Sequence, residues 1–535
     1  RNGYFEKLIK EYLLDNNHKS IISLVPEYGL EKEKEQKEAD KLAEYKSTLT
    51  NDELEELVKK TKELKEYQDT PSSQEDLENI PRLELSDIKR EPAKDYNDVK
   101  SVDGIKIVHH NIFTNKIAYI NMSFDTKCVP DELIPYMGLL GSTLSLMDTK
   151  NYTYPELTNE ININCGGLAT GTALYSDKVD FSKNTIVYEV KSKALYEKVP
   201  FVLGMMEEIM YNTRFDDYKR LKEIIARIKS RLEASLMGQG HSIAMLECCA
   251  QFSESAYYSD ILRGYKYYEF IKKLDEEFEQ NKTQIVDKLN KLVGYIFNKD
   301  NVIVSLTADD EGYDCFVKAL SAKSCNIKDE HYNTAVRSFI PVNVKTGYTS
   351  ASQVQYVARC GNFVKDGYKY TGALKVLKVI FSYDYLWINV RVKGGAYGCM
   401  SGSSRNGDFY MVSYRDPNLE KTNDIYEGAA DYIRNFNVSR RDMVKFIIGT
   451  IGEIDAPLTP SAIGSRSFTH YMCNCTEDML RKDREEVLDA TVESIRELAP
   501  LIESAVGQNY LCVVGNQKQI NEAADLFDEI KPLIG

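Results

Sequence analysis

Two long stretches of the chain carry the same succession of hydrophobic patterns. In the first, Ala118, Ile120, Met122 and Phe124 alternate with other residues, which predicts a strand over residues 117–124 that shares one buried face. Helical periodicity follows at residues 131–147 and 154–163, and then over much of the segment from 194 to 297. An apolar β-branched run at 302–306 predicts a closing strand, followed by a turn and a helix.

The second stretch repeats these elements in the same order. Strands are predicted at residues 353–360, 409–414 and 510–514, and a helix at 372–387. Each stretch contains a Gly-Gly pair, Gly166 in one and Gly394 in the other, 228 residues apart. The closing strands are 208 residues apart, so we infer an internal duplication with insertions and deletions. The fold class predicted is α+β: two homologous domains, each a mainly antiparallel sheet with helices packed on one face.

The first hundred residues follow a different pattern. Residues 4–14 read as a helix that is already in progress, and the apolar run at 21–25, stopped by Pro26, is typical of a final strand. More than half of residues 31–69 are charged, and Thr50 with Glu53 has the spacing of a capping box that restarts a helix. We interpret this segment as a charged helical hairpin; a solvated coil or disordered linker is the alternative.

These patterns predict six segments. They are the tail of a preceding domain (1–26), a helical hairpin (27–70), a linker (71–100), a first α+β repeat (101–325), a connector (326–350), and a second repeat (351–535). The chain begins without Met or a leader sequence, and we interpret it as a fragment.

Composition narrows the classes of function. The 535 residues are 43% hydrophobic and 10% aromatic, which is ordinary for globular domains. A net charge of −14 disfavours nucleic acid as a partner, and no apolar stretch approaches the roughly 20 residues that a membrane helix needs. The 11 cysteines form no regular disulfide framework, so reduced thiols and an intracellular location are expected.

Candidate metal ligands are few. Neither His-Glu-x-x-His nor His-x-x-Glu-His occurs, and the adjacent His109 and His110 would point to opposite faces of a strand. We favour a role in the core for His470, Cys473 and Cys475, because no fourth ligand is nearby; a zinc site is the alternative. No metal site is therefore predicted in this chain.

Motifs for nucleophilic or nucleotide chemistry are also missing from the sequence. It contains no Gly-x-Ser-x-Gly elbow and no phosphate-binding loop of the Walker type. Gly238-Gln239-Gly240 lacks a third glycine and does not follow a strand. Cys248 and Cys249 are interpreted as packing residues.

The segment that stands out runs from Arg391 to Gly398. Gly394 and Gly395 allow a tight turn that a ligand can approach closely, with a fixed cation, Arg391, and a phenol, Tyr397, six residues apart around it. Such donors suit the carbonyls of an extended peptide or a developing oxyanion. The alternative is a structural turn with a solvated arginine and a packed tyrosine.

Several spaced motifs resemble the presequence protease and falcilysin branch of the pitrilysin/insulysin zinc peptidases, in its C-terminal half. The resemblance extends over essentially the whole chain. It is carried by residues 391–398, Ser413-Tyr414-Arg415-Asp416-Pro417-Asn418, Asp455-Ala456-Pro457, Gly240-His241, Gln68-x-Thr70-Pro71 and Ile80-Pro81.

This resemblance implies one half of a clamshell that encloses a chamber, with residues 27–70 as the hinge and 101–325 as a non-catalytic repeat. The family's other, N-terminal half holds zinc through an inverted His-x-x-Glu-His helix and a distal Glu, with the motif's Glu as the base. At the equivalent place in this chain stand Glu132, Pro135 and Tyr136, which do not form a zinc site. Zinc is therefore expected in the missing N-terminal half and not in this chain.

The resemblance also assigns roles to the Gly-Gly segment. Tyr397 would donate to the tetrahedral oxyanion, and Arg391, with Gly394 and Gly395, would hold the substrate main chain. The hypothesis is the C-terminal half of a zinc metalloendopeptidase that degrades unfolded oligopeptides, inactive by itself and partnered by the N-terminal half. It would lie in the cytoplasm of a bacterium or an organelle matrix of a eukaryote. The alternative is a non-catalytic partner subunit or peptide-binding module of the same fold.

Overall fold

The computed structural model describes residues 3–25, 27, 29–70, 72–73, 75–76, 79–81, 83–322 and 326–534. The chain divides into two compact units, Arg1–Arg82 and Leu83–Gly535, which are described separately. Pro26 and Pro71, named above as boundaries, and residues 323–325, at the predicted end of the first repeat, lie outside the described residues.

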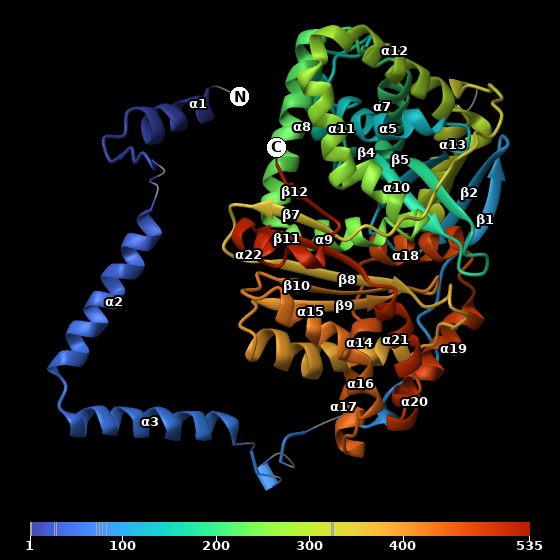
Figure 1. Cartoon of the computed structure of the whole chain (residues 1–535). Helices are drawn as coiled ribbons and strands as arrows, with labels where there is room; N and C mark the ends of the chain where they lie inside the picture. The colour runs from blue at the N-terminus through green and yellow to red at the C-terminus, as the bar shows by residue number, and fades with distance from the viewer. Residues whose placement is uncertain are drawn as a thin grey trace. The chain divides into compact units, whose positions relative to one another are not determined.

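The first unit contains helices and irregular backbone (Figure 1). The predicted opening helix is present as α1 (Tyr4–Leu8) continued by the π-helical turn η1 (Ile9–Leu14). The strand expected at residues 21–25 is not formed, and the side chains of Ile21 and Leu24 are 95% and 97% exposed. A strand needs a neighbour to pair its backbone N–H and C=O groups, and the described residues of this unit include no other strand.

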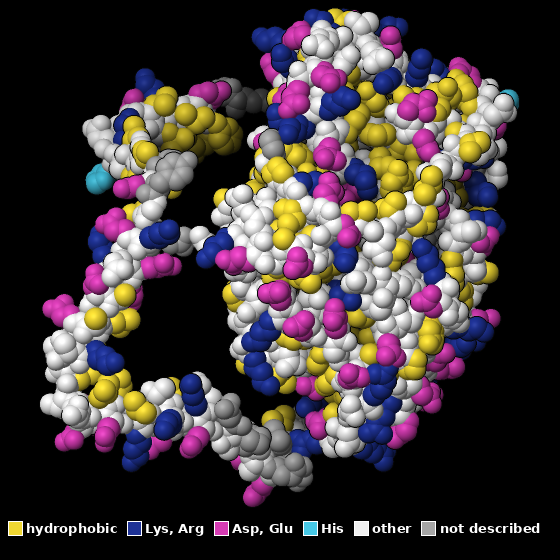
Figure 2. All heavy atoms as spheres, in the orientation of Figure 1, with side chains coloured by type: hydrophobic (Ala, Val, Ile, Leu, Met, Phe, Trp, Pro, Cys, Tyr) yellow, Lys and Arg dark blue, Asp and Glu magenta, His cyan; other side chains and the backbone are white. Residues whose placement is uncertain are grey.

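Two charged helices complete the first unit, α2 (Leu30–Thr48) and α3 (Asn51–Asp69). The capping box at the start of α3 is confirmed: the Thr50 N–H donates to Glu53 Oε2 at 2.8 Å, and the Glu53 N–H donates to Thr50 Oγ1 at 3.3 Å. Figure 2 shows cationic and anionic side chains along both helices. Apolar side chains such as Leu42 and Tyr67 remain more than half exposed, so the residues described in this unit form no packed hairpin core.

The second unit contains two six-stranded sheets. The first has the order β1-β2-β6-β3-β5-β4, and only β2 and β6 run parallel. Its strands are β1 (Asp98–Val102), β2 (Ile105–Asn111), β3 (Ile117–Asp125), β4 (Leu168–Ser176), β5 (Asn184–Leu195) and β6 (Val302–Ala308).

The second sheet has the order β12-β7-β11-β8-β10-β9, with β7 parallel to both of its neighbours. Its strands are β7 (Thr346–Ser350), β8 (Tyr356–Asn362), β9 (Gly398–Ser403), β10 (Asp408–Tyr414), β11 (Tyr510–Asn516) and β12 (Glu529–Pro532). Five strands of each sheet occur in matching order and direction, as the predicted duplication requires. The last five residues of the predicted connector 326–350 form β7, because pairing with β11 places them inside the sheet.

The helices of the second unit lie between or after these strands along the chain, and most of those in each repeat cover one face of its own sheet and form its main core. Those between β3 and β7 are α5 (Ile134–Thr143), α6 (Tyr154–Asn164), α7 (Val199–Tyr211), α8 (Tyr218–Gly238), α9 (Gly240–Cys249), α10 (Glu254–Arg263), α11 (Tyr265–Glu276), α12 (Phe278–Ile296) and α13 (Asp310–Ser321), with the short turns η3 (Asp131–Leu133), η4 (Tyr196–Lys198) and η5 (Lys299–Asn301). Those after β8 are α14 (Ala373–Ile380), η7 (Phe381–Tyr385), η8 (Trp387–Val392), α15 (Glu420–Glu427), α16 (Ala429–Arg434), α17 (Arg440–Ile454), α18 (Pro460–Met472), α19 (Glu477–Leu488), α20 (Val492–Arg496), α21 (Ala499–Gly507), α22 (Gln517–Glu522) and η9 (Ala524–Leu526). The α+β fold of two repeats is confirmed.

The opposite face of each sheet is contacted by a helix of the other repeat. Helix α9 of the first repeat packs on β8, β10 and β11, and α18 of the second repeat packs on β2 and β6. Glycines allow both contacts: a Cβ at Gly240 would lie 2.3 Å from Tyr356 Cδ2, and one at Gly464 would lie 1.9 Å from Thr307 Oγ1. The two repeats therefore exchange helices, which the sequence analysis did not anticipate.

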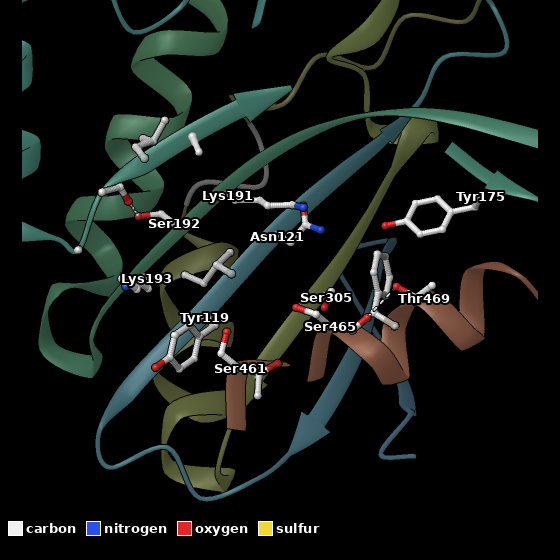
Figure 3. Close-up of a pocket in the computed structure, with 17 residues that line it drawn as sticks. Tyr119, Asn121, Tyr175, Lys191, Ser192, Lys193, Ser305, Ser461, Ser465 and Thr469 are labelled. Carbon is white, nitrogen blue, oxygen red and sulfur yellow. Dashed lines mark hydrogen bonds between the residues drawn. The ribbon is translucent and has the colours of Figure 1, made fainter. Parts of the chain in front are cut away.

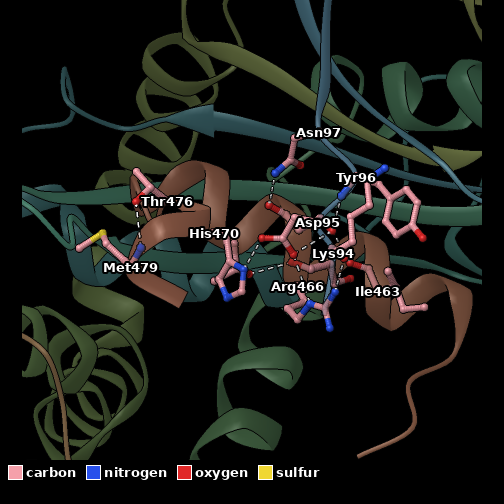
Figure 4. Close-up of polar contacts among 12 residues, drawn as sticks. Lys94, Asp95, Tyr96, Asn97, Ile463, Arg466, His470, Thr476 and Met479 are labelled. Carbon is pink, nitrogen blue, oxygen red and sulfur yellow. Dashed lines mark hydrogen bonds and ion pairs between the residues drawn. The ribbon is translucent and has the colours of Figure 1, made fainter. Parts of the chain in front are cut away.

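The segment before β1 contacts the second repeat before the chain enters the first. Leu85, in the turn η2 (Leu85–Asp87), packs against the second core, and the Arg484 guanidinium donates to the Lys89 carbonyl. Further along, Asp95 accepts from His470 Nδ1 at 2.6 Å and pairs with Arg466 at 3.3 Å, both on α18 (Figure 4). Residues 83–97 thus hold α18 against the start of the first sheet.

No helix in the described part of the chain combines the length and the apolar character that crossing a membrane requires.

Candidate functional site

Arg391 lies at the end of a long helical segment that turns π-helical. Helix α14 continues into η7 and then η8, and Arg391 is the penultimate residue of η8. Its guanidinium carbon lies 3.9 Å from the ring centroid of Trp387, the only tryptophan of the chain, four residues earlier. This stacking fixes the direction of a long side chain without pairing its charge. Trp387 was not singled out from the sequence.

The two glycines after the helix make the turn that the sequence predicts. Gly395 has φ +83°, a conformation that favours glycine, and its N–H donates to the Arg391 carbonyl at 2.9 Å. A Cβ at Gly394 would lie 2.4 Å from the carbonyl oxygen of Val390. Asn418 Nδ2 donates to the Gly394 carbonyl at 2.6 Å, so the turn is tied to the segment after β10.

A buried carboxylate organises that following segment. Asp416 is fully buried, where it accepts from the Asn418 N–H at 2.9 Å and from the Thr422 hydroxyl at 2.7 Å. Its backbone exchanges hydrogen bonds with Gln355. Burial raises the pKa of the Asp416 carboxyl, and these donors oppose that rise. Asp416 therefore has a structural role in holding the loop.

Tyr397 presents its phenol at the surface. Its N–H donates to the carbonyl oxygens of Tyr414 and Arg415, while its ring meets the Tyr414 ring edge-on at 5.8 Å. The side chain is 67% exposed, and its hydroxyl has no hydrogen-bond partner among the described residues. The Arg391 guanidinium lies 5.8 Å from the Tyr397 ring centroid. The structure thus brings the two predicted residues side by side, with both donor groups available to a ligand.

A pocket of about 760 Å³ opens beside Tyr397, between the two repeats. The first repeat contributes the junction of α8 and α9, where His241 packs edge-on against Tyr414 at 4.9 Å. Burial lowers the pKa of His241, and its buried Nδ1 has no hydrogen-bond partner among the described residues. The lining residues are Gly238, Gln239, His241, Ser242, Tyr397, Gly398, Cys399, Met400 and Tyr414.

The first repeat does not provide residues that fit a zinc ion at the family's metal position. Tyr136 is buried, packs edge-on against Phe270 at 4.8 Å and accepts from Lys288 Nζ at 3.2 Å, while Pro135 has no side-chain donor atom for a metal. Glu132 alone cannot make a zinc site, so no step of the chemistry is assigned to a metal here.

The other candidate ligands are separated. His470 bonds Asp95, whereas Cys473 is buried against Phe468 in the small core under α18. Within the described residues, three potential ligand atoms lie within 4.8 Å of one another only at Asp300, Asp329 and His331, all exposed. His109 and His110 bond different partners, Ala308 and Ser305 among them.

Comparisons with known families agree with the fold. Residues 24–274 match the family described as associated with the peptidases of family M16, subfamily C, and residues 347–516 match the PreP C-terminal domain. The chain is 39% identical to Protein HypA of Clostridium perfringens over 100% of its own length and 55% of that protein. It is 30% identical to presequence protease 1, chloroplastic/mitochondrial, of Arabidopsis thaliana, over 99% of this chain and 49% of the relative. The chain thus spans about half the length of these relatives.

Solved structures resemble the chain in fold at low sequence identity. One is the peptidase M16 inactive domain from Pseudomonas fluorescens, with a TM-score of 0.54, 15% identity, and coverage of 82% of this chain and 98% of that one. Another is a conserved protein from Enterococcus faecalis, with a TM-score of 0.57, 12% identity, and coverage of 78% and 97%. These similarities concern the fold alone.

Proposed function

Because the chain corresponds to the C-terminal half of a presequence protease-like M16 peptidase, we propose that it completes a zinc metalloendopeptidase whose metal lies in an N-terminal half. In this proposal the chain binds unfolded peptides and stabilises the transition state but does not cleave alone. The two halves enclose the substrate in a chamber, with α2 and α3 as the hinge between them. The location proposed is intracellular: the cytoplasm of a bacterium or an organelle matrix of a eukaryote.

The observation that carries the proposal is the adjacency of Arg391 and Tyr397 on either side of the Gly394-Gly395 turn. Their positions follow from Trp387 stacking, from the Gly394-Gly395 turn and from the contacts that tie it to β10. The Tyr397 phenol is exposed, and the half-buried Arg391 guanidinium has no acidic or hydrogen-bonding partner among the described residues. Donors that are fixed before substrate arrives stabilise developing charge at little reorganisation cost. The alternative role, a purely structural turn, requires neither the exposed phenol nor the unpaired guanidinium.

The two donors suit different parts of a peptide. The Arg391 guanidinium would hold a main-chain carbonyl of bound substrate, and the Tyr397 hydroxyl would donate to the oxygen that becomes negative as the scissile carbonyl turns tetrahedral. Gly394 and Gly395 would let the peptide backbone approach the turn closely. Zinc in the other half would supply Lewis acidity and an activated water.

The second candidate is a non-catalytic partner or peptide-binding module of the same fold. Glu132, Pro135 and Tyr136 do not make up a set of zinc ligands, and this favours a binding module as much as it favours an inactive half. The discriminating observation is the coding sequence upstream of Arg1. A His-x-x-Glu-His half joined to this chain supports the peptidase, and a separate start codon at this point supports the module.

The proposed function is tested by assaying a quenched fluorescent peptide with this chain alone and with the N-terminal half present. The chain alone should show no turnover and should hold less than one zinc per molecule. With the N-terminal half present, Arg391→Ala should raise KM and lower kcat, because a carbonyl clamp acts on bound substrate and on the transition state. Turnover by the chain alone, or a tightly held stoichiometric zinc, would contradict the proposal.

A further inference from the structure

A second pocket, of about 390 Å³, lies on the outer face of the first sheet beneath α18 (Figure 3). It opens at Gly166 and Gly167, the first repeat's counterparts of Gly394 and Gly395. Sheet strands form its floor, and α18 forms a wall with Ser461, Ser465, Phe468 and Thr469. Nothing in the proposed reaction uses this pocket.

Two rows of residues cross the floor. Strand pairing places Asn121 of β3 opposite Ser305 of β6 and Lys191 of β5. Two residues along β3, Tyr119 lies opposite Thr307 and Lys193. Directly opposed residues share a face of the sheet, so amide, hydroxyl and ammonium groups line one surface.

The positive charge on this floor is only partly neutralised. The buried Glu189 carboxylate accepts from Asn121 Nδ2 at 2.8 Å and from the Tyr175 hydroxyl at 3.1 Å, and it pairs with Lys191 Nζ at 2.6 Å. Lys193 is exposed at the edge of the pocket, and its Nζ has neither an acidic partner nor a hydrogen-bond acceptor among the described residues. One ammonium is thus left without a counter-charge. Asn121 Oδ1, although buried, has no donor within the described part of the chain.

The wall of the pocket adds positive potential. Ser461 is in the first turn of α18, a helix of 13 residues whose N-terminus is capped by Thr459. The N-terminal end of a helix carries partial positive charge that favours an anion nearby. Floor and wall therefore prefer the same kind of ligand, a small anionic group beside a hydrogen-bonding surface.

The duplication shows how this pocket differs from the Gly394-Gly395 turn of the second repeat. With the glycine pairs matched, Ile163 and Ala169 stand where the second repeat has Arg391 and Tyr397. Neither offers a donor to an oxyanion. The first repeat keeps the glycine turn, and the pocket floor with its two lysines lies next to that turn.

We propose that this pocket binds the carboxylate of a peptide, with the Lys193 ammonium as its counter-charge and the surrounding hydroxyls as hydrogen-bonding groups. Asn121 Oδ1 is positioned to accept an N–H of the same peptide. The peptide nature of the ligand rests on the proposed function; the carboxylate preference rests on the pocket alone. The carboxylate comes from a carboxyl terminus or from an Asp or Glu side chain.

The test is calorimetric binding to this chain, without the zinc-bearing half. Three short peptides of one sequence are compared: a free acid, its carboxyl-terminal amide, and the amide with one internal glutamate. The free acid should bind about tenfold or more tightly than the plain amide, and Lys193→Met should abolish that difference. Lys106→Met, on β2 of the same sheet but outside the pocket, is the matched control and should change nothing.

The amide with glutamate identifies the source of the carboxylate: binding like the free acid assigns any carboxylate, and binding like the plain amide assigns the terminus. Ser465→Trp, at an exposed position of the pocket wall, should weaken the free acid by filling the space. Equal binding of all three peptides, or an unchanged preference in Lys193→Met that remains folded by circular dichroism, would overturn the proposal. Because no turnover is measured, that failure is distinct from failure of the Tyr397 chemistry.

Discussion

The two Gly-Gly connections show how one backbone serves two purposes after duplication. In both repeats a helical segment ends, a glycine with positive φ follows, at Gly167 (+108°) and Gly395 (+83°), and an edge strand begins. In the second repeat the flanking side chains are an arginine and an exposed phenol; in the first, at the matched positions, they are Ile163 and Ala169. The two repeats therefore share the turn and differ in the side chains that flank it.

The largest effect is expected from a substitution at Tyr397. In the enzyme with both halves, Tyr397→Phe should lower kcat by about 10² to 10³, because the hydroxyl acts on charge that appears in the transition state. KM and zinc content should change little. Tyr383→Phe, an exposed tyrosine of η7, is the control. Near-normal turnover in a folded, metal-loaded Tyr397→Phe would assign the loop a structural role only.

Each of the two contacts made by an exchanged helix contains a histidine. Burial lowers the pKa of His110, under α18, to about 4 from 6.5, and lowers that of His241 on α9 as well. Between about pH 4 and pH 6.5, His110 is protonated in the unfolded chain and neutral in the folded chain. The free energy of unfolding therefore has its full contribution from His110 above pH 6.5, and this contribution is lost as the pH falls toward 4. The loss from His110 should be on the order of 3 kcal/mol.

Urea unfolding at about pH 7 and about pH 4.5 checks this expectation. His110→Gln should reduce the pH dependence of the free energy of unfolding, and His241→Gln should reduce it as well. If acidification lowers the free energy of unfolding of His110→Gln as much as that of the unsubstituted chain, His110 is not the source of the pH dependence.

The helix contacts themselves can be compared by adding one methyl group. Gly240→Ala would press on the Tyr356 ring and Gly464→Ala on Thr307, so each should lower the free energy of unfolding by about 2 kcal/mol. Gly238→Ala and Gly452→Ala, with nothing within 4 Å of the added carbon, are the controls. Thermal melting measures both pairs. A loss in only one exchanged contact would show that the two are not equivalent.

The smallest effect should come from the glycines of the two turns. Gly167→Ala and Gly395→Ala each force alanine into a left-handed conformation, at about 1 kcal/mol of stability. Turnover of the enzyme with both halves should fall only for Gly395→Ala, because only that turn positions the proposed donors. Equal effects on turnover would mean that the first turn also contributes to the reaction.

The sequence predicted features that depend on local pattern. The duplication, the charged helices with their cap at Thr50, and the turn at Gly394 all rest on short-range periodicity or on residues with special backbone preferences. The proximity of Arg391 and Tyr397 followed from that turn. Their catalytic roles, the hinge and the segment boundaries stay predictions.

What the sequence did not predict depends on distant contacts. Strand β7 lacks a distinctive pattern of its own and is stabilised by pairing with β11 and β12, far along the chain. The strand expected at residues 21–25 has a clear pattern but is not formed, because the described residues of its unit include no strand that could pair with it. Stacking by Trp387 and the helix exchange required knowledge of which faces meet.

The exchange of α9 and α18 has a consequence for how this chain can be divided. A cut in the connector before β7 would strip each sheet of the helix that covers its outer face and would leave Tyr356 and Phe468 exposed to water. Neither piece would then be an independent folding module, although each carries its own sheet and core. Gene fragments, domain swaps with relatives, and hybrid enzymes should therefore be joined before Leu83, where the chain separates into units, and not between the repeats.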